Sequence, residues 1–179
     1  MAETKEKKLD TTRRAVPFDK GDTGSVKAAK AMPPQVSAKM LSKAERPLLV
    51  VGSNLTDAQY DMVAKFAPKM AGVAATGKSL KPLLKRGVDA TYVNLYALAG
   101  YIADERWQGF DKKGKYDVCV FVGHIYYFAS HIIRGLVNFT DVRVVSIDRY
   151  YYPAAHITFG NLSDDDFMRA LDAVLEAME

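Results

Sequence analysis

From residue 35 onward the chain alternates short apolar runs with longer stretches in which apolar residues recur every three or four positions. A short apolar run bounded by turn residues is typical of a strand buried on both faces, and the longer period is typical of a helix with one face toward the core. The repeated strand and helix units predict an α/β fold: a Rossmann-like, doubly wound parallel sheet covered by helices on both faces.

The individual elements follow from these periods and from the residues that cap helices. Strands are predicted at residues 48–51, 72–76, 117–122 and 142–147. Helices are predicted at residues 36–45, 79–86, 94–102 and 125–138, and two more begin after Thr56 and Ser163. Thr56 has Gln59 three positions on, and Ser163 has Asp166, so we expect a capping box at the start of both helices.

Length and composition indicate one globular unit, because 179 residues with 49% hydrophobic content are enough for a single core. We divide the chain into an N-terminal arm, residues 1–34, and a Rossmann-like domain, residues 35–179. The arm holds eight Lys and Arg against five Asp and Glu, and the rest of the chain holds seventeen against sixteen. Because the arm has too few apolar residues to fold alone, we expect it to lie along a partner chain, with Phe18 as its main anchor.

Charge, hydropathy and cysteine content exclude several classes of function. A nearly neutral domain lacks the basic stripe that a nucleic-acid binder needs. The sequence has no apolar run long enough for a signal peptide or a membrane span, so we expect a cytoplasmic protein without membrane contact. A single cysteine, Cys119, forms no disulfide within the chain and is too few for a cluster or a zinc ribbon. Any metal centre therefore belongs to a partner.

The turns that follow the predicted strands are the candidate ligand site, because parallel sheets bind ligands beyond the carboxyl ends of their strands. The nine candidates are Gly52, Ser53 and Asn54 after the first strand, Thr76 and Gly77 after the second, Gly123 and His124 after the third, and Asp148 and Arg149 after the fourth. Glycines and helix-start amides suit phosphate, and a carboxylate suits ribose hydroxyls. The same residue types also serve turn geometry alone, and both interpretations stay open.

The first turn lacks the dinucleotide fingerprint. Only Gly52 stands where G-x-G-x-x-G requires three glycines, so we expect no binding of NAD. Ser53 also lacks the second glycine of a nucleophile elbow, which argues against hydrolysis.

Other reactive or large side chains carry several interpretations. The histidines, His124, His131 and His156, lack metal-ligand spacing and fit core or surface positions better. Two aromatic runs, residues 126–128 and 150–152, lie near the carboxyl edge, and Trp107 and Phe110 lie in the loop before the third strand. Such aromatics serve a protein interface, stacking on a cofactor ring, or the core, and we rank the interface and core interpretations equally.

Several stretches together resemble a known family. The strings "RPLLVVGS", "VAATG", "DATYVNLYALAGYIADERWQGFDKKGKYDVCVFVGH" and "ITFGNLS" are similar to the epsilon subunits of archaeal acetyl-CoA decarbonylase/synthase complexes, over residues 37–178. The order of segments also resembles the middle domain of thiamine-diphosphate enzymes, an FAD/NAD-binding-like Rossmann fold that holds FAD in some members.

The resemblance implies an accessory subunit rather than an enzyme in its own right. Such a chain docks on and stabilises the nickel–iron–sulfur CO dehydrogenase alpha subunit, with two large and two small chains, in a complex that oxidises CO and cleaves or makes acetyl-CoA. The clusters lie in the large chain, and we expect no cofactor in this one. The alternative that the resemblance implies is a flavin-binding electron-transfer subunit that holds FAD. The single glycine of the first turn favours the accessory role.

Overall fold

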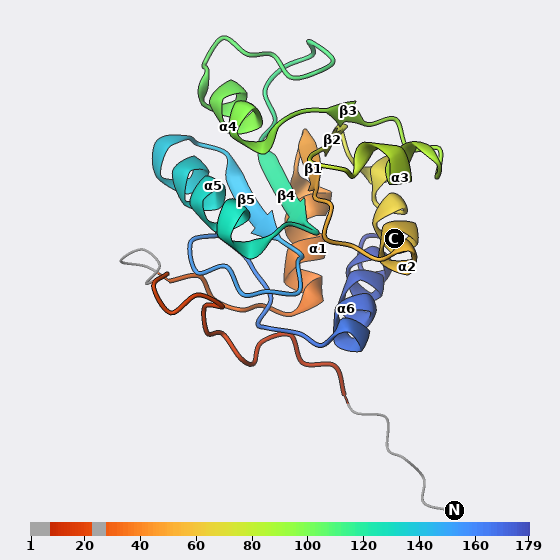
Figure 1. The fold of residues 1–179 in the computed structure, drawn as a ribbon, viewed down its shortest axis with the longest axis vertical. Coiled ribbons are helices and arrows are strands. Elements are labelled where there is room, and N and C mark those ends of the chain that lie inside the picture. Colours follow the sequence, from red (N-terminus) through yellow and green to blue (C-terminus); the bar gives the residue numbers. More distant parts are fainter. Residues whose placement is uncertain (1–7, 23–27) are drawn as a thin grey trace, which may run out of the picture.

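The computed structural model describes residues 8–22 and 28–179. The elements, in chain order, are α1 (Pro34–Lys43), β1 (Pro47–Val51), α2 (Asp57–Ala64), the 3-10 helix η1 (Ala67–Lys69), β2 (Gly72–Ala75), α3 (Leu80–Leu84), β3 (Thr91–Tyr92), α4 (Leu95–Ala103), β4 (Val118–Val122), α5 (Tyr126–Phe139), β5 (Arg143–Ser146) and α6 (Asp164–Glu176) (Figure 1).

The strands form one parallel sheet in the order β3-β2-β1-β4-β5. The chain runs from β1 outward to β2 and β3, then returns to the other side of β1 for β4 and β5. The strand order therefore reverses between β1 and β4, where such sheets have their switch point. The predicted α/β class is confirmed, and this order is consistent with a Rossmann-like sheet. The closer likeness to the domain of thiamine-diphosphate enzymes stays a prediction.

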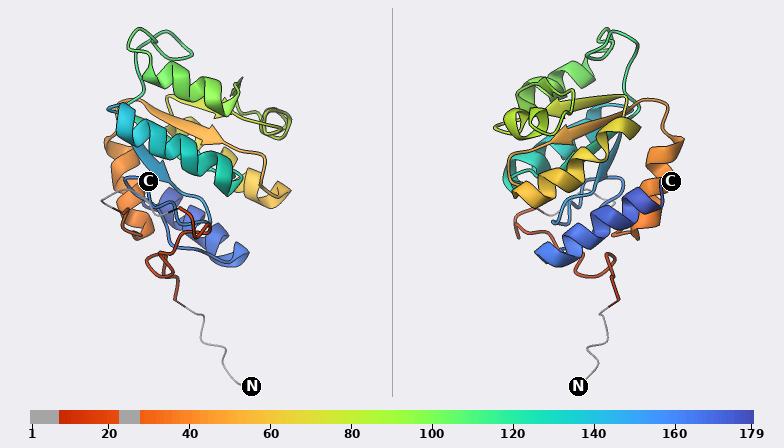
Figure 2. Two further views of the ribbon diagram at one scale, coloured as in Figure 1. Left: turned by 60° about the vertical axis from the view of Figure 1, so that its left-hand side comes forward. Right: turned by 90° about the vertical axis from the view of Figure 1, so that its right-hand side faces the viewer.

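Helices cover both faces of the sheet because its central strands are apolar on both sides. Every residue of β1 and β4 is buried. Side chains alternate along β1, so that Leu49 and Val51 pack with α1, α2 and α6, whereas Leu48 and Val50 pack with α4 and α5. Figure 2 shows these two helical layers on opposite faces.

The sequence prediction missed strand β3 and the 3-10 helix η1, and one of its two capping boxes is incomplete. Strand β3 was not expected: Thr91 and Tyr92 are exposed at the sheet edge, so they show no apolar run. The capping box at Thr56 forms in full, but Ser163 makes only half of one. Its Oγ accepts from the amide of Asp166 at 3.2 Å, whereas the Asp166 carboxylate pairs with Arg169 instead of returning to the cap.

The segment after β5 folds back along the outer side of that strand. The amide of Ser146 donates to the carbonyl of Ile157 at 2.8 Å, and the amide of Val144 donates to Nδ1 of His156 at 3.0 Å. Val145 forms a parallel bridge with Ile157. The β5 edge is therefore covered by the chain's own backbone.

The described part of the N-terminal arm lies against this returning segment (Figure 1). The amide of Gly160 donates to the carbonyl of Thr11 at 2.7 Å, and the amide of Met32 donates to Thr158 at 2.9 Å. The side-chain amide of Asn161 donates to two arm carbonyls at 3.0 and 2.7 Å. The arm is thus held mainly by backbone hydrogen bonds, which its composition does not reveal.

Phe18 and Asp22 fix the arm to the start of α5. The Phe18 ring lies 5.6 Å from the ring of Tyr126 and 5.1 Å from that of Tyr150. The Asp22 carboxylate accepts from the Tyr126 hydroxyl at 2.7 Å and pairs with Arg134. The prediction that the arm folds only along a partner is therefore wrong for these residues, because Phe18 packs on rings of its own chain. A contact of the half-exposed Phe18 ring with a partner stays a prediction. Residues 1–7 and 23–27 of the predicted arm lie outside the described residues, and the boundary at residues 34 and 35 stays a prediction.

Candidate functional site

The turns after β1 and β4 touch at the switch point. The Gly52 amide donates to the carbonyl of Val122 at 2.9 Å, and the Asn54 amide donates to the carbonyl of Gly123 at 2.8 Å. A Cβ atom on Gly52 would lie 2.1 Å from the Gly123 oxygen. Gly123 has φ +75°, and a Cβ there would lie 2.4 Å from the Leu55 side chain. Both glycines are therefore required by the close approach of the two turns.

His124 is buried beside Thr76. The Thr76 hydroxyl donates to the carbonyl of Val51 at 3.0 Å, and its oxygen lies 3.2 Å from Nε2 of His124. Because the single hydroxyl proton is used on Val51, the histidine carries its proton on Nε2 and donates to Thr76. Nδ1 is buried, and no described residue donates to it. Burial lowers the pKa of His124 to about 3, so the ring is neutral.

Asp148 joins the turns after β4 and β5. Its carboxylate accepts from the amide of His124 at 3.1 Å and from the amide of Arg149 at 2.8 Å. Burial raises the pKa of Asp148 to about 6, although amide donors from Gly123, His124 and Arg149 act in the opposite direction. Arg149 itself turns toward Asp164, with which it pairs, and its guanidinium lies 5.4 Å from the ring centre of Tyr150.

The structure brings most of the sequence-predicted candidates to one edge of the sheet. Five are buried there and bonded to one another or to strand ends: Gly52, Thr76, Gly123, His124 and Asp148. Ser53, Asn54 and Gly77 are exposed at the rim, where a Cβ on Gly77 would lie 3.0 Å from the Ser53 hydroxyl. The described polar atoms of this cluster act mainly as ties between turns. Whether the nine residues hold a cofactor stays a prediction.

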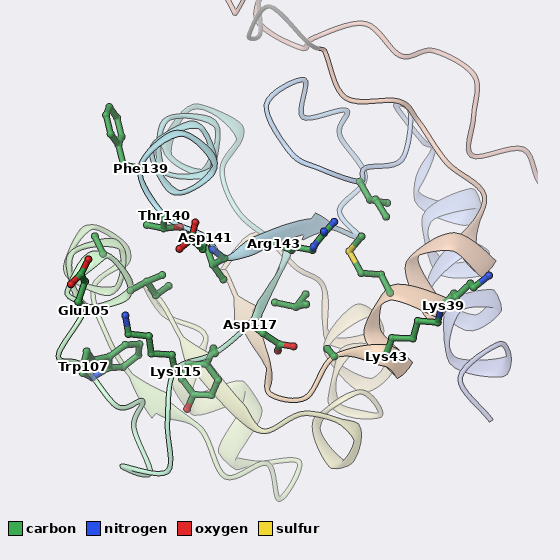
Figure 3. A pocket seen from close by; sticks show the side chains of 18 of the residues that line it. Lys39, Lys43, Glu105, Trp107, Lys115, Asp117, Phe139, Thr140, Asp141 and Arg143 are labelled. Carbon is green, nitrogen blue, oxygen red and sulfur yellow. Dashed lines mark hydrogen bonds between the residues drawn. The ribbon is translucent and has the colours of Figure 1, made fainter.

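A groove of about 720 Å³ lies at the opposite end of the sheet, beside the amino ends of β4 and β5 (Figure 3). It lies between α1, the segment that follows α4 and the turn between α5 and β5. We call it the amino-end groove. None of the nine predicted residues lines it. Sequence reasoning missed it, since Lys39 and Lys43 are four residues apart on α1 but no pattern connects them with Lys115 or Arg143.

The aromatic residues divide between core and surface. Tyr126, Tyr151 and Tyr152 are buried, as the core interpretation expected. Another group stays about half exposed around the start of α5, and we call it the apolar patch: Phe18, Tyr96, Ile125, Tyr127 and Phe128. The rings of Tyr96 and Phe128 lie 6.4 Å apart, and those of Phe18 and Tyr127 lie 6.1 Å apart.

The described residues give no support to a reactive thiol, a metal site or a membrane span. Burial raises the pKa of the Cys119 thiol to about 12, so the thiolate is disfavoured. Across residues 8–22 and 28–179 there is no group of three His, Cys, Asp or Glu side chains placed to hold a metal ion. Within the same residues, every helix is too short or too polar to cross a bilayer.

The burial of His124 predicts a specific pH dependence. The unfolded chain protonates this histidine below its ordinary pKa of 6.5, whereas the folded chain keeps it neutral to about pH 3. The free energy of unfolding of the wild type should therefore fall, relative to His124→Gln, by about 1 kcal/mol per unit as the pH drops from 6 to 4. Urea unfolding across this range measures it.

Asp148 acts in the opposite sense. Its raised pKa gives a stabilising contribution that is present below pH 3.8 and lost as the pH rises through about 6. Because both proteins contain Asp148, its contribution cancels in the difference between wild type and variant. Parallel stability curves for the two proteins would contradict the assignment of a neutral, buried His124.

Comparison with known proteins identifies the family. A family described as "CO dehydrogenase beta subunit/acetyl-CoA synthase epsilon subunit" matches residues 11–175. An acetyl-CoA decarbonylase/synthase complex subunit epsilon from Methanothrix soehngenii is 38% identical, over 100% of both chains. An epsilon 1 subunit from Methanosarcina barkeri is 35% identical over 95% of this chain and 99% of its own. One from Archaeoglobus fulgidus is 38% identical over 92% and 90%.

These matches confirm the resemblance drawn from the four strings. They extend it toward the N-terminus, because the matched region begins at residue 11, inside the arm. The chain belongs to the family of acetyl-CoA decarbonylase/synthase epsilon subunits.

Proposed function

We propose that this chain is a non-catalytic small subunit that docks on the nickel–iron–sulfur CO dehydrogenase alpha subunit of an acetyl-CoA decarbonylase/synthase complex and stabilises it. The relatives are named as subunits of that complex, and the family description joins CO dehydrogenase with acetyl-CoA synthase. The assembly that we propose holds two large and two small chains, in the cytoplasm.

The apolar patch is the observation that carries this proposal. Its five members come from the arm, from α4 and from the start of α5, and all remain about half exposed. Two ring pairs bring these parts together, Phe18 with Tyr127 and Tyr96 with Phe128. Contiguous exposed apolar side chains mark interaction surfaces, and aromatic residues dominate the centres of protein interfaces. Covering such a surface with a protein partner is more favourable than leaving its apolar side chains in contact with water.

Electron transfer through a bound flavin has less support. At the switch point, where a dinucleotide would lie, the turns that carry Gly52 and Gly123 are in close contact. The carboxylate of Asp148, the candidate for ribose, already accepts backbone amides. We therefore do not assign FAD to this chain. The visible absorption spectrum after mixing with FAD and gel filtration tests this, and a retained flavin band would contradict it.

Loss of the patch should weaken assembly. In the double variant Ile125→Ser and Phe128→Ser, the dissociation constant for the CO dehydrogenase subunit should rise at least about a hundredfold, because buried interface anchors are each worth about 2 kcal/mol or more. Serine is favourable at Ile125, which is the N-cap of α5, so the helix should persist. Sedimentation of mixtures of the two subunits measures the constant.

The matched control removes two exposed apolar side chains outside the patch. Leu84 is 54% exposed at the end of α3, and Phe139 is 83% exposed at the far end of α5. The double variant Leu84→Ser and Phe139→Ser should bind as the wild type does. An equal loss in both double variants would exclude the patch as the docking surface. Failure of the wild-type chain to bind or to raise the melting temperature of the large subunit would overturn the proposed function itself.

A further inference from the structure

The amino-end groove has the size and position of a ligand site. Its volume of about 720 Å³ lies within the range of about 300–1,000 Å³ that small-molecule pockets occupy. Five separate stretches of the chain line it, and its apolar lining includes Val36, Met40, Val118, Val142 and Ile157. It lies at the amino ends of the strands, away from the turns that the sequence singled out.

Positive charge gathers at one end of the groove. Lys39 and Lys43 lie four residues apart on α1, so they share one side of that helix. Figure 3 shows Arg143 extending from β5 on the side of the groove toward these lysines. Among the ion pairs of residues 8–22 and 28–179, none includes these three cations.

One carboxylate, Asp117, lies at this end, but its oxygens are already used. They accept from the amides of Glu45 and Arg46 at 2.8 and 2.9 Å, which directs the carboxylate to the turn between α1 and β1. This end of the groove therefore carries three cations and one engaged carboxylate. An anion entering the groove would find donors and a net positive field.

The other end of the groove is apolar and mixed in charge. Trp107 and Phe139 line it, and its charged residues are Lys115, Glu105 and Asp141 (Figure 3). Phe139 is 83% exposed, although burial of a phenylalanine side chain is favourable in free energy. The lysine and the two acids leave no excess of positive charge at this end. The groove is thus polarised along its length, cationic toward α1 and apolar toward Trp107.

We propose that the amino-end groove binds an amphiphilic organic anion. Its carboxylate or phosphate would lie against Lys39, Lys43 and Arg143, and its apolar chain or ring would extend over Met40 and Val142 toward Trp107 and Phe139. A neutral ligand would leave the three cations without a partner, and an inorganic anion would leave the apolar lining exposed. This proposal does not depend on the docking role of the apolar patch.

Trp107 makes the groove directly observable, because it is the only tryptophan of the chain. Decanoate is the probe, and decanol is its neutral counterpart. Decanoate should change the Trp107 fluorescence saturably, and decanol should bind at least about fivefold more weakly. In the double variant Lys39→Gln and Lys43→Gln, decanoate should bind about fivefold to tenfold more weakly, while decanol binding stays unchanged.

The control variant is Lys81→Gln with Lys85→Gln. These lysines are also four residues apart and exposed, they line none of the groove, and their loss changes net charge equally. It should bind decanoate as the wild type does. Equal binding of decanoate and decanol, an equal loss in the control variant, or no saturable signal would overturn the proposal. So would a Trp107 signal that responds to the CO dehydrogenase subunit and to no small anion, because the groove would then belong to the protein interface.

Discussion

The Gly52→Ala variant should lose at least about 4 kcal/mol of its free energy of unfolding, a loss seen only when a substitution cannot be accommodated. The added Cβ would lie 2.1 Å from the carbonyl oxygen and 2.6 Å from the carbonyl carbon of Gly123. Both are backbone atoms, so no side-chain rotation relieves the overlap. The two turns would have to separate, and the amide of Gly52 would lose its bond to Val122.

Gly135→Ala is the matched control for this prediction. Gly135 lies inside α5, and a Cβ there would meet no atom within 4 Å. Alanine favours a helix interior by about 0.5–1 kcal/mol over glycine, so this variant should be slightly more stable than the wild type. Urea unfolding compares the three proteins. A Gly52→Ala variant within 1 kcal/mol of the wild type would mean that the turns after β1 and β4 are not in contact.

Gly160→Ala should lift the arm from the domain and lower the free energy of unfolding by about 2–4 kcal/mol. A Cβ on Gly160 would lie 1.6 Å from the carbonyl oxygen of Arg13. Because the arm is peripheral, it should detach rather than deform the sheet. The loss then comprises the backbone bonds of the arm and the ring contacts of Phe18 with Tyr126 and Tyr150.

A truncated chain that begins at residue 23 separates this effect from damage to the domain. If alanine acts by displacing the arm, Gly160→Ala should change the stability of the truncated chain by less than about 0.5 kcal/mol, since the atom that it strikes is gone. Thermal unfolding of all four proteins completes the cycle. A similar loss with and without the arm would show that the alanine disturbs the domain itself.

The strands and helices were predictable because their signal is local. Residues 48–51 and 117–122 are continuous apolar runs, and they became β1 and β4 within one residue at either end. Strand β3 escaped because its two residues are exposed and pair only at the sheet edge. The position of the arm was not predicted for a different reason. Its hold on Gly160 and Asn161 is made through backbone carbonyls, which every sequence possesses.

The sequence predicted where the candidate site residues lie, but not that several of them are buried and hydrogen-bonded to neighbouring turns. Parallel strands bring their carboxyl ends together, so Thr76, His124 and Asp148 had to lie near one another. Their burial depends on how the turns pack, because Asp148 accepts amides from two different loops. The amino-end groove could not be predicted from the sequence. Its cations come from positions 39, 43 and 143, which line one groove only once the sheet has formed.

The covered β5 edge limits how another chain can join this one. The outer amides of Val144 and Ser146 are bonded to residues 156 and 157 of the same chain, and β3 at the other edge is only two residues long. In the described part of the chain, a partner therefore finds too little free strand backbone to extend the sheet. A partner therefore has to recognise this chain through side-chain contacts. An interface of that kind can dissociate and form again without breaking the backbone hydrogen bonds of a shared sheet.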